Sequence, residues 1–156
     1  MAKLNFIAEL GKQEIVMIRV FNAPRDLVFQ ALTDPAMIQQ WWGPRYLTTT
    51  VEKMDLRHGG LWRYVQKNQE GHEYAFRGVY HEIVSPERLV YTIEFEGMPG
   101  HIGLETITLE EQDGKTIMTD KGVFQSVEDR DGMVQSGMEG GATESMDRLA
   151  ELVEKD

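Results

Sequence analysis

Hydrophobic and polar positions follow three successive patterns along this chain, and the first predicts a strand followed by two short helices. Residues 13–22 are rich in β-branched side chains, which favour a strand. Pro24 then suits the first turn of a helix, and apolar residues recur at helical spacing up to about residue 33. An acidic residue followed by proline, Asp34-Pro35, repeats this start signal and predicts a second helix through about residue 40.

The second pattern alternates β-rich runs with turn signals and predicts six further strands. Its strongest turn signal is Asp113-Gly114, because a two-residue type I′ hairpin needs positive φ at both positions. Strands joined by loops this short are antiparallel neighbours. The expected strands cover residues 46–57, 61–67, 74–84, 89–96, 103–112 and 115–124.

The third pattern begins at Ser126, where apolar residues return to a helical period. The stripe predicts one amphipathic helix of up to about thirty residues. Gly137, Gly140 and Gly141 oppose it, because each costs up to about 1 kcal/mol relative to alanine in a helix interior. We therefore expect that the backbone here either passes close to another segment or bends.

The order of these elements indicates the α+β class. It predicts a curved antiparallel sheet of about six to seven strands, two short helices and a long C-terminal helix. The last helix is the only expected element long enough to cover one face of the sheet, and a curved sheet around it would leave an apolar cavity. The 156 residues fit a single domain over residues 1–156, in which residues 1–12 are an N-terminal extension expected to be loosely ordered.

Composition excludes several kinds of site and partner. The chain has no cysteine, which rules out disulfides, zinc–thiolate sites and cysteine nucleophiles. Its net charge of −10, without a run of Lys or Arg, disfavours nucleic acids and anionic membrane surfaces. No stretch approaches the roughly 18 apolar residues of a membrane span, and the N-terminal residues do not form a signal peptide. We therefore expect a cytoplasmic protein.

Motifs for cofactors and metals are missing from the sequence. The four histidines are isolated, and none forms a pair with metal-ligand spacing. Neither a phosphate-binding loop nor a dinucleotide-binding glycine motif occurs, and no serine lies in a Gly-x-Ser-x-Gly elbow. We expect no metal and no cofactor.

Three side chains are candidates for proton transfer. Glu82 and Asp120 share strand faces with apolar or aromatic residues, and His81 is a neighbour of the first. A carboxyl group that faced a cavity would lose solvation, which raises its pKa and suits it to acid–base chemistry. Arg19 on the first strand is the candidate counter-ion. The alternative is that these carboxylates lie in solvent.

Strand parity predicts which side chains line the cavity. Gly78 stands between Phe76 and Tyr80 on one face, where the missing side chain would create room. In the Trp41-Trp42 pair, one indole is expected to close the end of the sheet and the other to lie at the cavity mouth. The alternative for every aromatic and methionine in the set is an ordinary packed core. The expected lining residues are Trp42, Trp62, Tyr64, Phe76, Gly78, Tyr80, Tyr91, Phe95, Met118, Met138 and Met146.

Several segments together resemble one known superfamily. They are Asn22-Ala23-Pro24, Trp41-Trp42-Gly43-Pro44 and residues 59–64, 76–83, 86–92 and 140–149, in this order. The chain resembles the START-like (SRPBCC) superfamily, and within it the branch of the activator of heat-shock protein 90 ATPase. The resemblance implies the helix-grip (START/Bet v-like) fold, a hydrophobic cavity and a single-domain, bacterial-type protein. Members share this fold while their ligands and activities vary.

Three hypotheses about function follow. We favour a binding module for a small apolar or aromatic molecule. The second is an enzyme similar to the cyclase and hydratase members, with Glu82, Asp120 or His81 in proton transfer. The third is a chaperone co-factor, which is disfavoured because the chaperone activators carry an additional N-terminal domain that we do not expect here. Homodimer formation stays open.

Overall fold

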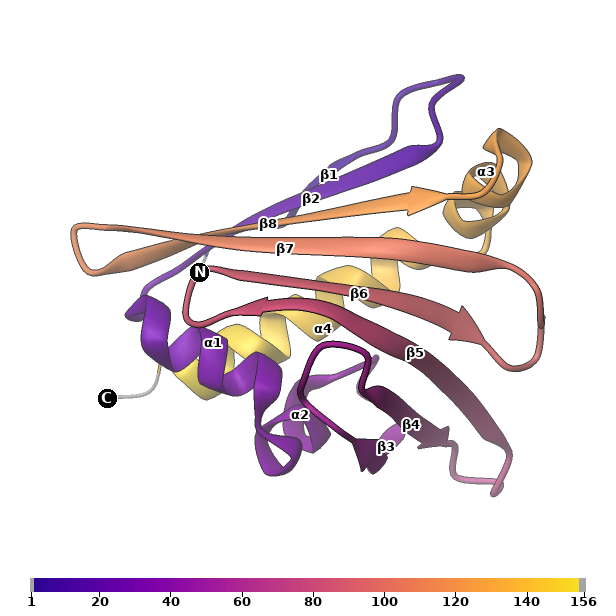
Figure 1. Ribbon diagram of the computed structural model, residues 1–156, viewed down its shortest axis with the longest axis horizontal. Coiled ribbons are helices and arrows are strands. Elements are labelled where there is room, and N and C mark those ends of the chain that lie inside the picture. Colours follow the sequence, from indigo (N-terminus) through magenta and orange to yellow (C-terminus); the bar gives the residue numbers. More distant parts are fainter. Residues whose placement is uncertain (1, 155–156) are drawn as a thin grey trace.

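One antiparallel sheet curves around the C-terminal helix in the computed structural model, which describes residues 2–154 (Figure 1). The strand order is β1-β2-β8-β7-β6-β5-β4-β3 in an eight-stranded sheet. The strands are β1 (Asn5–Ile7), β2 (Glu14–Phe21), β3 (Thr48–Met54), β4 (Leu61–Lys67), β5 (Glu73–Val84), β6 (Arg88–Phe95), β7 (Ile102–Gln112) and β8 (Lys115–Phe124). The helices are α1 (Arg25–Thr33), α2 (Pro35–Trp41), α3 (Val127–Gln135) and α4 (Met138–Val153). The predicted α+β class and helix-grip arrangement are confirmed.

Tight turns make neighbouring strands antiparallel, as the sequence predicted. Asp113 and Gly114 have φ values of 55° and 78° and join β7 to β8, with Gln112 opposite Lys115. The first long strand, β2, pairs with β8 along its whole length, from Glu14 opposite Val123 onward. The chain thus returns to its beginning, and the long central strands form a continuous concave face.

The strand count was one too low. Residues 5–7 form β1, which pairs with β2 at the edge of the sheet, with Phe6 opposite Met17. The expected loose extension therefore contains an ordered strand. Three residues give no measurable alternation, so the pattern of the sequence could not reveal this strand.

The predicted single C-terminal helix is wrong, because it is divided into α3 and α4. Gly137 adopts a left-handed conformation with φ 88° at the start of α4, which favours glycine. Of the two expected reasons for the glycines, a bend therefore applies at Gly137. A close approach does not apply at Gly140 or Gly141, because a Cβ atom at either position would meet nothing within 4 Å.

Helix α4 crosses the concave face, while α1 and α2 cover one end of the sheet and α3 lies at the other (Figure 1). The buried residues of α4 include Met146, Leu149, Ala150 and Val153, which pack on the core formed by the sheet and the first two helices. Trp41 is buried there and donates its indole N–H to the carbonyl oxygen of Ala31 at 2.8 Å.

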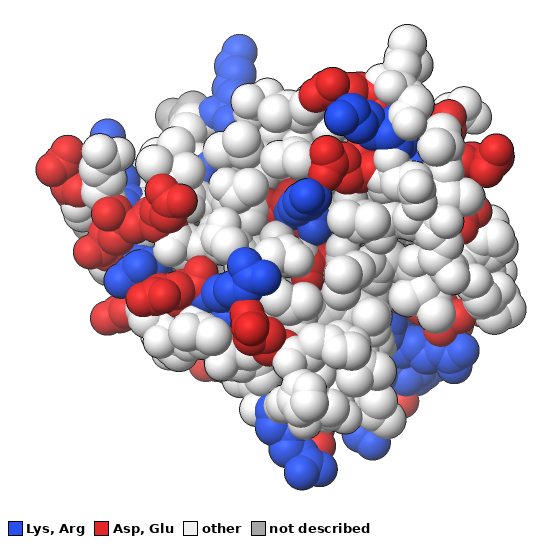
Figure 2. Space-filling model, turned by 45° about the horizontal axis from the view of Figure 1, so that its top comes forward, with Lys and Arg blue, Asp and Glu red and all other residues white. Residues whose placement is uncertain are grey.

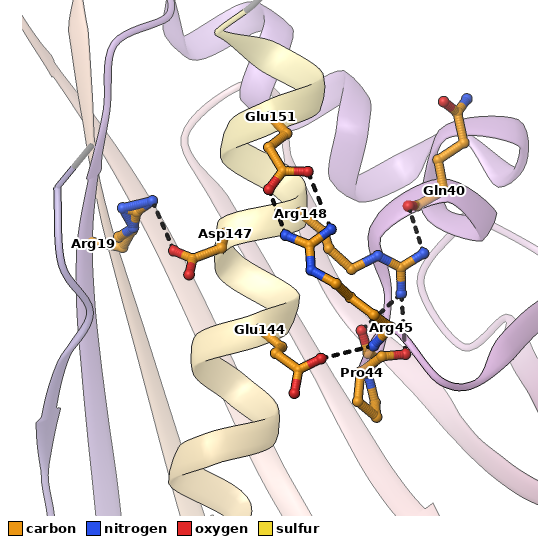
Figure 3. A network of polar contacts seen from close by, with 9 residues as sticks. Arg19, Gln40, Pro44, Arg45, Glu144, Asp147, Arg148 and Glu151 are labelled. Carbon is orange, nitrogen blue, oxygen red and sulfur yellow. Dashed lines mark hydrogen bonds and ion pairs between the residues drawn. The ribbon is translucent and has the colours of Figure 1, made fainter.

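Polar contacts fix the C-terminal part of α4 to the segment after α2 (Figure 3). Arg148 donates to the carbonyl oxygens of Gln40 and Gly43, each at 2.8 Å. Arg45 pairs with Glu151, and its backbone N–H donates to Glu144. Guanidinium donors satisfy carbonyl groups that would otherwise lack partners. Helix α4 is therefore anchored most firmly at and beyond Glu144.

Charged side chains are interspersed over the outer surface, with acidic and basic groups alternating across the face in Figure 2. On the solvent side of the strands, Arg63 pairs with Glu96 at 2.7 Å and Arg77 with Glu94 at 3.1 Å. Both glutamates of these pairs are half-buried, whereas the arginines lie nearer the surface. Among the described residues, no helix is long and apolar enough to cross a membrane.

Candidate ligand-binding cavity

A cavity of about 470 Å³ lies between the concave face of the sheet, α2 and α4. Its wall draws residues from β2, from strands β4 to β8 and from all four helices or the turns that follow them. Apolar side chains such as Leu32, Ile38 and Ile107 line it, together with a large group of aromatic residues. The aromatic wall residues are Trp41, Trp42, Tyr46, Trp62, Tyr64, Tyr74, Phe76, Tyr80, Tyr91 and Phe95.

Edge-to-face contacts hold the aromatic wall together. The ring centroid of Trp42 lies 5.1 Å from that of Tyr64 and 5.1 Å from that of Phe76, with interplanar angles of 84° and 73°. Trp62 meets Tyr91 at 5.8 Å and 86°. Such arrangements are favoured by the charge distribution of aromatic rings. The rings therefore support one another in the wall.

Gly78 does not line the cavity, so its predicted role is wrong. A Cβ atom there would lie 1.7 Å from the carbonyl oxygen of Thr92 and 2.6 Å from Nε1 of Trp62. The Trp62 indole crosses above Gly78 and donates to that carbonyl oxygen at 3.1 Å. The glycine thus makes room for an indole, not for a ligand. All the other predicted lining residues lie in the wall.

Two carboxyl groups stand side by side in the otherwise mainly apolar wall. Glu105 on β7 and Asp120 on β8 are each only 8% exposed, and both line the cavity. Gly122 lies opposite Glu105 in the sheet, where a Cβ atom would come within 2.9 Å of Glu105 Oε1. The absence of a side chain at Gly122 therefore leaves the space that the Glu105 carboxyl group occupies.

The environment of this pair favours a retained proton. Burial raises the pKa of Asp120 well above its usual value, and the nearby Glu105 carboxylate raises it further. Among the described residues, Glu105 Oε2 and Asp120 Oδ1 have no hydrogen-bond partner. A proton retained on Asp120 relieves the repulsion between the two carboxyl groups.

Three tyrosine hydroxyl groups face the same space. Burial raises the pKa of Tyr80 to about 12, partly offset by a hydrogen bond from Tyr64. Burial also raises the pKa values of Tyr64 and Tyr91, and for Tyr91 the charges of Asp120 and Glu105 add to the effect. These hydroxyl groups are therefore neutral at physiological pH and serve as donors and acceptors.

Only one of the three proton-transfer candidates lies in the wall. Asp120 does, whereas Glu82 and His81 are exposed and Glu82 pairs with Arg88. The reason is a register irregularity between Tyr80 and Glu82, which changes the face on which the following residues lie.

The predicted counter-ion is also elsewhere. Arg19 is buried, but its guanidinium group contacts Asp147 on α4 at 3.3 Å (Figure 3), not Asp120. Within residues 2–154, no group of three or more His, Cys, Asp or Glu side chains is placed to hold a metal ion. The carboxyl pair is thus left without a basic partner from the described wall residues.

Glu105 was missed at the sequence level, although a signal for it existed. It shares strand parity with Ile107 and Leu109, both of which are buried. On β8, Asp120 and Gly122 alternate in the same way with buried Met118. Comparing these two alternations across the Asp113-Gly114 hairpin would have placed both acids on the inner face.

Three exposed wall residues mark the mouth of the cavity, one after α2, one at the start of β5 and one on α3. Tyr46 is 68% exposed, Met133 41% and Tyr74 37%. Gly141 also lines the cavity, and a side chain there would project into open space. The mouth therefore lies beside the first turns of α4, before its polar anchors begin.

Comparison with known proteins assigns the fold to a family. Residues 22–154 match the family described as "Activator of Hsp90 ATPase homolog 1-like protein". Because the match spans most of the chain, the protein belongs to this family, and the resemblance found in the sequence is confirmed. None of the curated protein sequences compared with the chain matches it.

Solved structures share the whole architecture. A crystal structure of a Chromobacterium violaceum protein is 29% identical, with a TM-score of 0.83 over 92% of this chain and 99% of that one. A solution structure of an Arthrobacter aurescens protein is 23% identical, with a TM-score of 0.90 over 97% of this chain and 92% of that one. A Mycobacterium smegmatis protein is also 23% identical, with a TM-score of 0.87 over 98% and 97%. The latter two show likeness of fold alone.

Proposed function

We propose that this protein binds a small, largely apolar molecule with an aromatic part inside the cavity. The observation that carries the proposal is the cavity of about 470 Å³ behind an aromatic wall. Ligand pockets usually enclose about 300–1,000 Å³ and combine apolar walls with a few polar groups. The carboxyl pair and the tyrosine hydroxyl groups are such polar groups here.

The size of the space supports a ligand more than an ordinary core. Protein interiors are close-packed, and voids larger than a water molecule are few. Side chains around an empty apolar space lose dispersion contacts, which costs stability. Gly141 adds to the space, although a Cβ atom there would meet nothing within 4 Å. A ligand that occupied the cavity would restore the missing contacts.

Tryptophan fluorescence tests the proposal directly, because all three tryptophans of the chain line the cavity. The titrations would use decanoate, cholate, the flavonoid naringenin and an anthraquinone, alongside thermal unfolding with each compound. We expect saturable quenching by at least one aromatic compound, together with a raised melting temperature, since a ligand of the folded state stabilises it. If no compound bound more tightly than about 1 mM, the proposal would be refuted.

A further inference from the structure

The charges of the cavity wall are of one sign. Glu105 and Asp120 are its only Asp or Glu residues, and the wall contains no Lys, Arg or His among the described residues. A ligand with a carboxylate or phosphate group would therefore meet negative charge without a compensating partner. In a space of low polarity such a mismatch is costly, whereas a positive charge would be attracted.

The pair also has unused hydrogen-bonding capacity. Glu105 Oε2 and Asp120 Oδ1 are buried acceptors without a partner in the described part of the chain. Buried polar groups in proteins nearly always have partners, and each exception calls for a physical reason. A proton shared between the two carboxyl groups can serve only one pair of oxygens. The two named oxygens have almost no accessible surface and fit this proton, whereas the other oxygen of each carboxyl group is the acceptor that a ligand donor would meet.

The sheet makes room for this arrangement. Gly122 is the residue of β8 that faces Glu105, and even a methyl group there would crowd the carboxyl oxygens, at 2.9 and 3.1 Å. Rings with electron-rich faces stand nearby, since Tyr91 lies opposite Glu105 on β6 and contacts Trp62. Aromatic faces and carboxylates both attract ammonium groups.

We propose that the Glu105–Asp120 pair binds a protonated amine, so that the ligand is an aromatic or apolar amine and not an acid. This inference rests on the proposed function, because it assigns the polar end of the molecule in the cavity. The ammonium group donates to the free carboxyl oxygens, and the apolar body of the ligand lies against the aromatic wall toward Trp42 and Phe76. The tyrosine hydroxyl groups of Tyr64 and Tyr80 complete the polar region.

Three compounds with the same ring system separate charge from shape: naphthylethylamine, naphthylethanol and naphthylacetate. Their affinities for the full-length protein are measured by titration calorimetry at neutral pH. We expect the amine to bind about tenfold or more tightly than the alcohol, because a hydrogen bond to a charged group is worth more than a neutral one. The acid is expected to bind most weakly.

The double variant Glu105→Gln/Asp120→Asn keeps the shape of both side chains and removes their charge. It should lose the preference for the amine while its affinity for the alcohol stays within about threefold of wild type, which also shows that it is folded. Glu82→Gln is the matched control, since it removes an exposed carboxylate from β5 and should leave the preference unchanged.

The outcomes separate the two proposals. If the alcohol binds as tightly as the amine, the role of the pair is refuted, and binding in the cavity stands. A preference that persists in the double variant would also refute it, because the charge would then come from elsewhere. If none of the three compounds binds, both the amine site and the proposed function lose their support.

Discussion

Replacing Gly141 with leucine tests whether the open space is the binding site. Both Gly140 and Gly141 lie in the first turns of α4, and a Cβ atom at either meets nothing within 4 Å. They differ in what surrounds them, because Gly141 lines the cavity and Gly140 is exposed to solvent. Gly140→Leu is therefore a control matched in element, residue type and helix propensity.

The expected magnitudes follow from these surroundings. Either substitution gains up to about 1 kcal/mol from helix propensity. Only Gly141→Leu also buries an apolar side chain, which is worth about 1.5–3 kcal/mol when burial is complete. The two variants should therefore differ by about 1–3 kcal/mol in the free energy of unfolding, with Gly141→Leu the more stable. Each kcal/mol corresponds to about 2–4 °C in melting temperature for a chain of this size.

Binding should change in the opposite direction. The leucine side chain at position 141 takes up space that a ligand needs, so the affinity for naphthylethanol should fall at least about tenfold. Gly140→Leu should bind as wild type does. Urea unfolding and titration calorimetry provide the two measurements. Unchanged affinity in Gly141→Leu would refute the reasoning, and so would an equal loss in both variants, because flexibility of the helix would then explain the effect.

Three further substitutions, one of them with a matched control, test the internal arrangement. Asp120→Asn should stabilise the protein more at neutral pH than near about pH 4. Burial raises the folded-state pKa of Asp120, so this carboxyl group destabilises the fold as the pH rises above the pKa that it has in the unfolded chain. Urea unfolding across this pH range would contradict the reasoning if the substitution stabilised the protein equally throughout. Gly122→Ala should lower the free energy of unfolding by about 1–3 kcal/mol and weaken amine binding. Gly103→Ala is the control and should be tolerated, because the nearest atom lies 3.5 Å from the new Cβ. Gly78→Ala should lower the free energy of unfolding by about 3 kcal/mol or more and change the emission of Trp62. The reason is that the new Cβ atom would meet a carbonyl oxygen at 1.7 Å. Near-native stability of this variant would contradict the position of the indole.

The order of the elements could be predicted from the sequence because each rests on a local signal. The prolines Pro24 and Pro35, the Asp113-Gly114 turn and the change from a two-residue to a helical period at Ser126 are all signals that operate within a few residues. The break between the two C-terminal helices at Gly137 was harder to predict from the sequence. The three glycines indicated either a bend or a close approach of another segment. The left-handed φ of Gly137 shows the bend, and the open space around Gly140 and Gly141 excludes a close approach there.

The candidate site was predictable as far as strand parity holds. Parity placed Tyr80 and Tyr91 on the inner face and made Asp120 a candidate for it, and all three line the cavity. It failed at Glu82 because an irregularity in the β5–β6 register intervenes, and a single sequence carries no clear sign of it. It also failed at Gly78, because the side chain that fills the space beside it comes from another strand.

The cavity and the carboxyl pair are linked by what each costs the fold in the absence of a ligand. An unfilled apolar space forgoes dispersion contacts, and two buried acids with unpartnered oxygens forgo hydration. Substitutions could lessen either cost, because a Cβ atom at Gly141 would meet nothing within 4 Å and amides match the two acids in shape. Departures from the most stable arrangement tend to gather at functional sites. Because a single molecule with an apolar body and an ammonium group would offset both costs at once, the two features are best understood as parts of one binding site.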